Sequence, residues 1–460
     1  MEHTLKSYHD VDVVLPSQVF NVAYSYTMKE PLDFIDSMVL RLLIITPLSA
    51  DKIAQFLELT NHETDVLLTN LLHREQIQHL EDGKFALTKQ LEKAFTDVCA
   101  VPYVSKIEDN IQKMSFEMIG LNPEPVNPNL LDNGANSIKL KAQGENLSNS
   151  ETFVYKEFQK NFRFFCSQDL VKLNLVTPED EKNVQLYKMG QVEKLRDYSR
   201  RVTLSLTLDE SMAPNELTEF NHLNNFEKIE DALYTALKES KKPENIEDII
   251  KVLNTLDLEE DTGIGSIFSD NKLHLDRLLN LKHASNEYFI GPIYSKENAD
   301  LFFKKINEAS GHQGEQNPLY WLAPSDDFWG KSDRFSDFVD RLSVSAMTKS
   351  FKCFLPVAHQ NDKQSISNFK KIISAQAGAN NCYMVNETSL NFQGNFEILV
   401  MKDSFCALII HVSDPRVNFL TTVPVGIFIS DKAVIQSFYN MFKEIESDEE
   451  NFYGPLNKRK

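Results

Sequence analysis

The stretch TNHETDVLLTNLLHREQIQHLEDGKFALT, residues 60–88, decides how the N-terminal part of the chain folds. Thr60, with Glu63 three residues later, forms a capping box that opens a helix. Four leucines at helical spacing give that helix one buried stripe: Leu67, Leu68, Leu71 and Leu72. QIQHL, a turn at Asp82–Gly83 and KFALT then read as a strand, a turn and a return strand. The stretch therefore predicts a helix followed by a β-hairpin.

The same helical spacing continues on both sides of this stretch. DFIDSMVLRLLIIT (33–46) and ADKIAQFLEL (50–59) predict two earlier helices separated by Pro47, and KQLEKAFTDV (89–98) predicts a later one. Three helices followed by a hairpin wing predict a winged helix-turn-helix within residues 33–120. The Leu87–Thr88 pair after the second wing strand is similar to what MarR-like and TrmB-like regulators show there.

The flanking regions predict other kinds of structure. VDVVLPSQVFNVAYSYTM (11–28) reads as two short strands around a turn at Pro16–Ser17, which makes residues 1–32 a β-hairpin extension. Residues 121–152 are rich in proline and asparagine and predict a linker. Residues 153–269 predict a mainly helical middle region with one strand at RVTLSLTL (201–208).

Residues 270–460 alternate predicted helices with predicted strands, the pattern of an α/β layered domain. Within it, NFEILVMKDSFCALIIHVSD (395–414) predicts a strand, a tight polar turn and a return strand. A last helix carries Asp431, Ala433, Phe438 and Phe442 at the spacing D-x-A-x-x-x-x-F-x-x-x-F. This region resembles the phospholipase D-like module that follows a winged helix in many TrmB-type regulators. The overall prediction is a mixed α/β protein: an N-terminal winged helix, a helical middle and a C-terminal phospholipase D-like domain.

The hairpin at 395–414 lacks the residues that catalysis in the phospholipase D superfamily uses. The pattern there is His, any residue, Lys, four residues, then Asp. With its Asp placed on Asp403, the His position is Phe396 and the Lys position is Ile398. Neither side chain can attack phosphorus or hold its oxygens, and His411 on the return strand has the wrong spacing. No catalytic residue is therefore expected, and Lys402–Asp403 is either a polar turn or a retained ligand contact.

The bulk composition excludes several classes of protein. The net charge of −19 argues against bulk attraction to nucleic acid or anionic lipid. Five cysteines are widely scattered with no zinc-ligand spacing, so no metal and no cofactor are expected, and reduced thiols favour a cytoplasmic location. No apolar run is long enough for a membrane span. Trp321 and Trp329 are expected either to pack in a core or to stack on a ligand.

The predicted winged helix leaves two functions open. Its third helix and wing would expose His62, Asp65, Thr69, Asn70, His73, Arg74 and Lys84, which could contact DNA or a protein partner. Residues 33–97 hold eleven Asp and Glu against six Lys and Arg, a poor balance for entering a DNA groove. One hypothesis is a non-enzymatic DNA-associated regulator with a catalytically dead sensor domain. The alternative is an interaction subunit of a bacterial, defence-type complex, and a homodimer is a further option. A basic surface strip would favour the first, and an exposed apolar patch the second.

Overall fold

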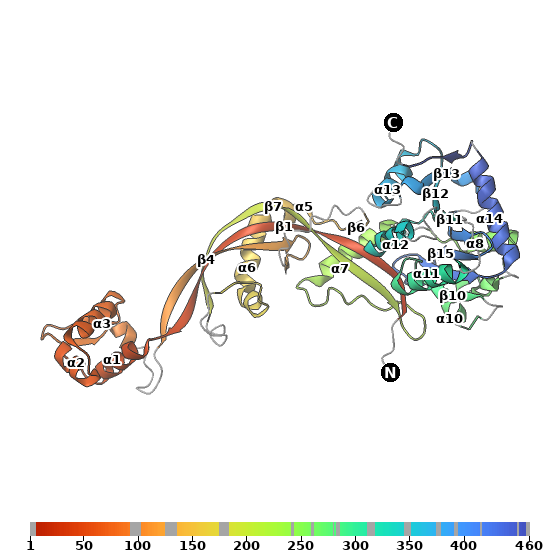
Figure 1. Cartoon of the computed structure of the whole chain (residues 1–460). Coiled ribbons are helices and arrows are strands. Elements are labelled where there is room, and N and C mark those ends of the chain that lie inside the picture. The colour runs from red at the N-terminus through yellow and green to blue at the C-terminus, as the bar shows by residue number, and fades with distance from the viewer. Residues whose placement is uncertain are drawn as a thin grey trace.

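The computed structural model describes residues 6–92, 103–124, 136–173, 184–240, 243–258, 262–278, 280–281, 286–310, 318–344, 351–373, 379–390, 394–414, 416–448 and 450–456. The protein is a mixed α/β structure, as the sequence predicts. A helical head, a long β arm and an α/β body follow one another along an elongated molecule (Figure 1). The first described residue, Lys6, lies beside the body, where it lines a cavity with strand residues of the body.

The head, residues 33–92, has the elements predicted for a winged helix. They are α1 (Phe34–Ile45), α2 (Ala50–Leu57), α3 (Asn61–His73), the antiparallel wing strands β2 (Ile77–His79) and β3 (Phe85–Leu87), and α4 (Lys89–Glu92). The capping box is confirmed, because the Thr60 side chain accepts from the Glu63 N–H while the Glu63 carboxylate accepts from the Thr60 N–H at 2.8 Å. Residues 93–98 of the predicted fourth helix lie outside the described part.

The arm is a sheet built around one long strand, β1 (Lys6–Pro31). β1 pairs antiparallel with β4 (Tyr103–Glu117) on one side and with β7 (Gln185–Leu208) on the other. β1 runs out to the head and β4 returns from it, so the head is an insertion between two paired strands (Figure 1). One face of the arm packs against α6 (Ser150–Ser167) through Phe158, Phe162 and Phe165. That face forms a core of its own, away from the body.

The structure differs from three expectations about this region. The strand continues through Pro16 without a turn, and the Pro16 carbonyl accepts from the Met118 N–H at 2.8 Å. The described part of the expected linker contributes β5 (Pro123–Glu124), β6 (Ile138–Lys139) and α5 (Gly144–Ser148). In the expected helical middle, the strand β7 begins at 185 rather than 201. Bulges in the β1–β7 pairing shift the alternation of side chains, so the period of two that marks a strand is not sustained in the sequence.

The body is built on an eight-stranded sheet with the order β10-β16-β15-β14-β11-β12-β13-β17. The neighbouring strands β11, β12 and β13 run parallel to one another, and the other pairs are antiparallel. The bounds are β10 (Glu287–Ile290), β11 (Leu319–Leu322), β12 (Lys352–Val357), β13 (Cys382–Asn386), β14 (Phe396–Met401), β15 (Phe405–Val412), β16 (Val423–Ile429) and β17 (Phe452–Tyr453).

Helices cover both faces of this sheet and make it a three-layer structure. One face packs against α11 (Lys296–Ser310), α12 (Asp333–Val344) and α13 (Lys363–Ile373). The other packs against α7 (Phe226–Ser240), α8 (Ile246–Thr255) and α14 (Lys432–Ser447), and its core continues into the base of the arm. Shorter elements complete the body: η2 (Ile264–Ile267), β8 (Phe268–Ser269), β9 (Lys272–Leu273), α10 (Leu275–Leu278), η3 (Ala379–Asn381) and η4 (Glu387–Ser389).

The contacts of α14 account for the spacing of the residues that the sequence analysis singled out in this last helix. Asp431 caps α14 by accepting from the Ala433 and Val434 N–H groups at 2.7 and 3.2 Å. Phe438 and Phe442 lie four residues apart on its buried face, and Phe442 stacks on Tyr320 of β11 with ring centres 5.4 Å apart. None of the helices among the described residues is both long and apolar enough to cross a bilayer.

Candidate functional site

The head exposes every residue that the sequence singled out for contact with DNA or a partner. His62, Asp65, Thr69, Asn70 and His73 lie on the solvent side of α3. Two further residues, Arg74 at the end of α3 and Lys84 on the wing, are exposed as well. The structure therefore brings the predicted set onto one head, and their role in binding stays a prediction.

Both cations of that set are held by carboxylates of the head itself. Arg74 Nη1 lies 2.9 Å from Asp36 Oδ2 on α1, and Lys84 Nζ lies 2.5 Å from Asp82 Oδ2 in the wing turn. A phosphate would have to compete with these carboxylates for each cation. Such pairing lowers the gain from neutralising DNA phosphates, which supplies most of the affinity in non-specific DNA binding.

The head also exposes large apolar side chains. Phe34, Met38 and Ile45 lie four and seven residues apart along α1, so they share one face of that helix. Phe34 is 79% exposed and Ile45 is 69% exposed. Phe56 on α2 and Val66 on the solvent side of α3 add to the exposed apolar surface. Exposed apolar groups at this density on one small domain are typical of a surface that another protein covers.

The hairpin predicted from residues 395–414 is present as β14 and β15. Phe396 and Ile398, at the positions of the superfamily's His and Lys, are 1% and 0% exposed in the core beneath α14. Lys402 and Asp403 form the turn, and Asp403 has the left-handed φ of 53°. The turn lies at the end of the hairpin remote from the polar cluster described next, so a ligand pocket at Lys402 and Asp403 gains no support from the structure.

A buried polar cluster lies at the other end of the same hairpin. His411 is its centre, with Nδ1 2.7 Å from Asp326 Oδ2 and Nε2 3.1 Å from Glu397 Oε2. Thr422 donates to Asp326 at 2.6 Å, and the two indole N–H groups of Trp321 and Trp329 donate to Glu397 at 2.9 and 3.1 Å. We call these six residues the histidine cluster.

Charge explains how this cluster stays buried. Burial alone would lower the pKa of His411, but its hydrogen bonds to Asp326 and Glu397 outweigh burial and raise the pKa to about 9. Burial would raise the pKa of Asp326, but the hydrogen bond and charge of His411, together with the hydrogen bonds from Thr422 and the Phe328 N–H, outweigh burial and lower the pKa to about 2. His411 is therefore an imidazolium that donates from both nitrogens. It has no free lone pair to act as a nucleophile or a base.

The sheet topology assembles the cluster from segments that are distant in sequence. Asp326 follows the end of β11, Glu397 lies at the start of β14, His411 is near the end of β15, and Thr422 precedes β16. Because β14 and β15 are antiparallel neighbours, the start of β14 and the end of β15 lie side by side at one end of the strands. Sequence reasoning missed this site, although one acid and one histidine inside two apolar strands were its signal.

A hollow of about 350 Å³ opens beside the cluster, at the carboxyl ends of β11 and β12. Its lining includes Ser325, Asp326, Asp327, Trp329, Lys331 and Phe369, and we call it the edge hollow. In open α/β sheets, ligands bind outside the carboxyl ends of the parallel strands. Trp329 packs in the core, as one of the two expectations has it, and stacking on a ligand stays a prediction.

The loop that lines the edge hollow also anchors the arm. The Asp12 N–H of β1 donates to the Lys331 carbonyl at 2.8 Å, and the Asp12 carboxylate accepts from the Asp333 N–H at 2.8 Å. Arg201 of β7 pairs with Asp12 at 3.0 Å. Arg334 Nη1 pairs with Asp10 at 2.9 Å. Residues 326–334 therefore connect the histidine cluster to the base of the arm.

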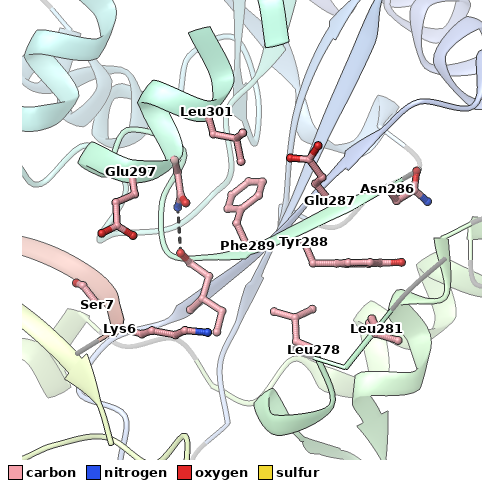
Figure 2. Close-up of a pocket in the computed structure, with 12 residues that line it drawn as sticks. Lys6, Ser7, Leu278, Leu281, Asn286, Glu287, Tyr288, Phe289, Glu297 and Leu301 are labelled. Atoms are coloured by element: carbon pink, nitrogen blue, oxygen red, sulfur yellow. Dashed lines mark hydrogen bonds between the residues drawn. The ribbon is translucent and has the colours of Figure 1, made fainter. Parts of the chain in front are cut away.

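A second cavity of about 440 Å³ lies along strand β10 (Figure 2). Lys6 and Ser7 approach it from the arm, and Leu278 and Leu281 lie on the same side of β10 in this view, with Leu301 on the other side. Asn298 of α11 donates to the Ile290 carbonyl at 3.0 Å. Within the described ranges, no group of three or more His, Cys, Asp and Glu side chains is placed to hold a metal ion.

Comparison with known proteins gives only remote similarities. No protein-family model matches the chain, and no curated protein matches it in sequence. Among solved structures, the archaeal chromatin protein TrmBL2, described with a novel mode of DNA binding, is 11% identical over 90% of this chain and 92% of its own, with a TM-score of 0.21.

Two phospholipase D-type structures are also similar over part of the chain. Nuc of Salmonella typhimurium, a phospholipase D family member, is 9% identical with a TM-score of 0.23, and NucT of Helicobacter pylori is 12% identical with a TM-score of 0.22. Each covers 37% of this chain and 99% of its own. All three TM-scores are too low to support an inference about function, which must come from the geometry.

Proposed function

We propose that the protein is a non-enzymatic interaction subunit whose winged helix head binds another protein. The observation that carries this proposal is the apolar face of α1, formed by Phe34, Met38 and Ile45. Burying apolar surface stabilises association by roughly 25 cal/mol per Å², and large exposed aromatic and aliphatic groups are the usual anchors of protein interfaces. The head is placed at the far end of the arm, where a large partner can reach it without meeting the body (Figure 1).

Contact with DNA is the competing function for the same head. A DNA reader needs free cations along its recognition helix and wing. Here Arg74 and Lys84 are paired with Asp36 and Asp82, and the solvent side of α3 carries Glu63 and Asp65. These charges favour the protein-binding function over the DNA-binding function.

A non-enzymatic role for the body rests on two observations. Phe396 and Ile398 are packed into the core where the superfamily has its nucleophile and its cation. The buried histidine of the body, His411, donates from both ring nitrogens to carboxylates. A protonated imidazole cannot attack a phosphorus atom. The body would then serve as a scaffold for the arm and as a binding module.

Site-specific photo-crosslinking in the native host tests the protein-binding function. A photoreactive amino acid at Phe34 should give a discrete crosslinked band, and the same group at Tyr187, which is 62% exposed on β7, serves as the matched control. A band at twice the chain mass would identify the partner as a second copy. In parallel, gel shifts at roughly 50 mM salt should show no DNA binding, because phosphate contacts are strong at that salt. A shift that weakens in the Arg74→Ala, Lys84→Ala double variant would overturn the proposal.

A further inference from the structure

Strand β10 lies at one edge of the eight-stranded sheet, and its outer side is unpaired within the described part of the chain. β16 pairs with its inner side from Glu287 to Ile290. In an antiparallel pair, residues whose N–H and C=O groups bond the neighbour alternate with residues whose groups point away from it. The Gly291 N–H donates to the Pro424 carbonyl of β16 at 2.8 Å, which fixes this alternation. The backbone groups of Tyr288 and Ile290 therefore point to the outer edge.

One of these four backbone groups is already bonded. The Asn298 side chain of α11 donates to the Ile290 carbonyl at 3.0 Å. The Tyr288 N–H, the Tyr288 carbonyl and the Ile290 N–H have no hydrogen-bond partner among the described residues. Unpaired backbone groups along a sheet edge are a template for a further strand. The chemical complement of this edge is therefore the backbone of an extended peptide.

This edge also borders the cavity of about 440 Å³ shown in Figure 2, which we call the β10 groove. Leu281 lies on one side of β10 and Leu301 on the other. Both leucines are half-buried, so each can still lose exposed apolar surface to a ligand. The arm closes one end of the groove, because the Ser7 carbonyl lies 3.4 Å from the place that a Cβ on Gly291 would take. The groove thus offers apolar contact on both faces of an added strand.

The charges around the β10 groove cancel one another. Glu287 forms an ion pair with Lys305 of α11. Lys6 and Glu297 contribute one further charge of each sign to the lining. A strongly acidic or strongly basic ligand would therefore meet as many like charges as opposite ones. A peptide segment with uncharged side chains at the positions that enter the groove fits this balance.

We propose that the β10 groove binds an extended, uncharged segment of another protein, which adds a strand to the sheet beside β10. Main-chain hydrogen bonds to Tyr288 and Ile290 would hold the segment, and its alternate side chains would lie against Leu281 and Leu301. A second copy of this chain fits less well, because its own β10 lies between the same two walls and the walls of the two copies would collide. This binding goes beyond the function proposed for the head and does not rest on it.

Peptide selection on the full chain tests the proposal. Random heptapeptides displayed on phage are selected, and hydrogen–deuterium exchange then identifies those that protect residues 286–291. Such a peptide should bind saturably in fluorescence anisotropy. N-methylation of one alternate set of its amides should weaken binding at least about fivefold, because each methyl group removes a hydrogen bond to the edge. Methylation of the other set should be tolerated, because those amides point away from β10.

Two substitutions of one residue isolate the backbone contact on the protein. Tyr288→Pro and Tyr288→Val both remove the hydroxyl group that donates to the Thr262 carbonyl at 2.5 Å, but only proline also removes the N–H that faces the edge. Strands tolerate proline where the N–H points out of the sheet. Tyr288→Pro should therefore bind the peptide at least about fivefold more weakly than Tyr288→Val. Thermal unfolding separates lost binding from lost folding, and the methylated peptides decide the matter if the proline variant does not fold.

Three results would rule out the added strand. One is that no selected peptide protects residues 286–291. Another is that a protecting peptide tolerates methylation of either set of amides, because it would then bind through its side chains alone. The third is a dimer in analytical ultracentrifugation that Tyr288→Pro dissociates and Tyr288→Val preserves, because the occupant of the groove would then be a second copy of the chain.

Discussion

Replacing His411 by leucine should destabilise the body strongly, because it leaves two carboxylates without their shared partner. Asp326 would keep the Thr422 hydroxyl at 2.6 Å and the Phe328 N–H at 3.1 Å, and Glu397 would keep the two indoles. Breaking a buried ion pair by removing one partner costs about 3–5 kcal/mol. The remaining donors place the expected loss near the lower end, at about 3 kcal/mol.

The pKa of His411 gives the same magnitude by an independent route. It is raised from 6.5 to about 9, and each pKa unit is worth about 1.4 kcal/mol, which makes about 3 kcal/mol. Because the folded-state pKa is above the unfolded one, this stabilisation is fully present below pH 6.5. It is lost as the pH rises through about 9. The free energy of unfolding should fall over this range in the wild type, and the fall should be absent from the His411→Leu variant.

Urea unfolding followed by tryptophan fluorescence measures this directly, since both tryptophans report on the cluster. His359→Leu, in an exposed loop of the same body, is the matched control and should change stability by less than about 0.5 kcal/mol. Two results would refute an imidazolium shared by two carboxylates. One is a loss of less than about 1 kcal/mol in the free energy of unfolding of His411→Leu at pH 6. The other is that this free energy falls above pH 6.5 in the variant as it does in the wild type.

Three further outcomes follow from single contacts. Burial lowers the pKa of His9 to about 4, against the opposing effect of the Asp326 charge. The free energy of unfolding is therefore higher by about 3 kcal/mol above pH 6.5, and this stabilisation is lost as the pH falls through 4. In urea unfolding, the His9→Phe variant should lose this dependence of stability on pH. Gly426→Ala would place a Cβ 2.0 Å from the Phe289 ring and should cost about 1–3 kcal/mol, and a variant as stable as the wild type would contradict this packing. Assays with bis(p-nitrophenyl) phosphate should show no turnover, and turnover that Asp403→Ala abolishes would contradict a non-enzymatic body.

The head could be predicted from sequence because its signals are local. The capping box at Thr60 and the wing turn at Asp82–Gly83 each lie within a few residues. The arm could not, because its strands exceed the usual length and bulges interrupt their alternation. A proline, Pro16, inside a strand added a false turn signal.

The histidine cluster shows a different limit of sequence reasoning. Glu397 and His411 are single polar residues in apolar strands, and nothing local pairs them with Asp326, which lies 71 residues before Glu397 in the chain. Only the antiparallel register of β14 and β15, together with the end of β11, brings them within hydrogen-bond distance. Long-range pairing of this kind depends on the strand topology, and a single sequence does not reveal that topology.

The arm makes the molecule a lever with its fulcrum at the body. β1 has 26 residues, and at about 3.3 Å per residue it spans at most about 85 Å. Asp10 and Asp12 are pinned near one end of this span by Arg334, Asp333 and Arg201, while the head is attached at the other. The head lies about 20 residues beyond these contacts, at most about 66 Å away, so a tilt of about 5° there would move the head by about 6 Å, more than the spacing of two neighbouring strands. A small rotation at the body therefore becomes a displacement of the head that is large enough to make or break the contacts of an interface there.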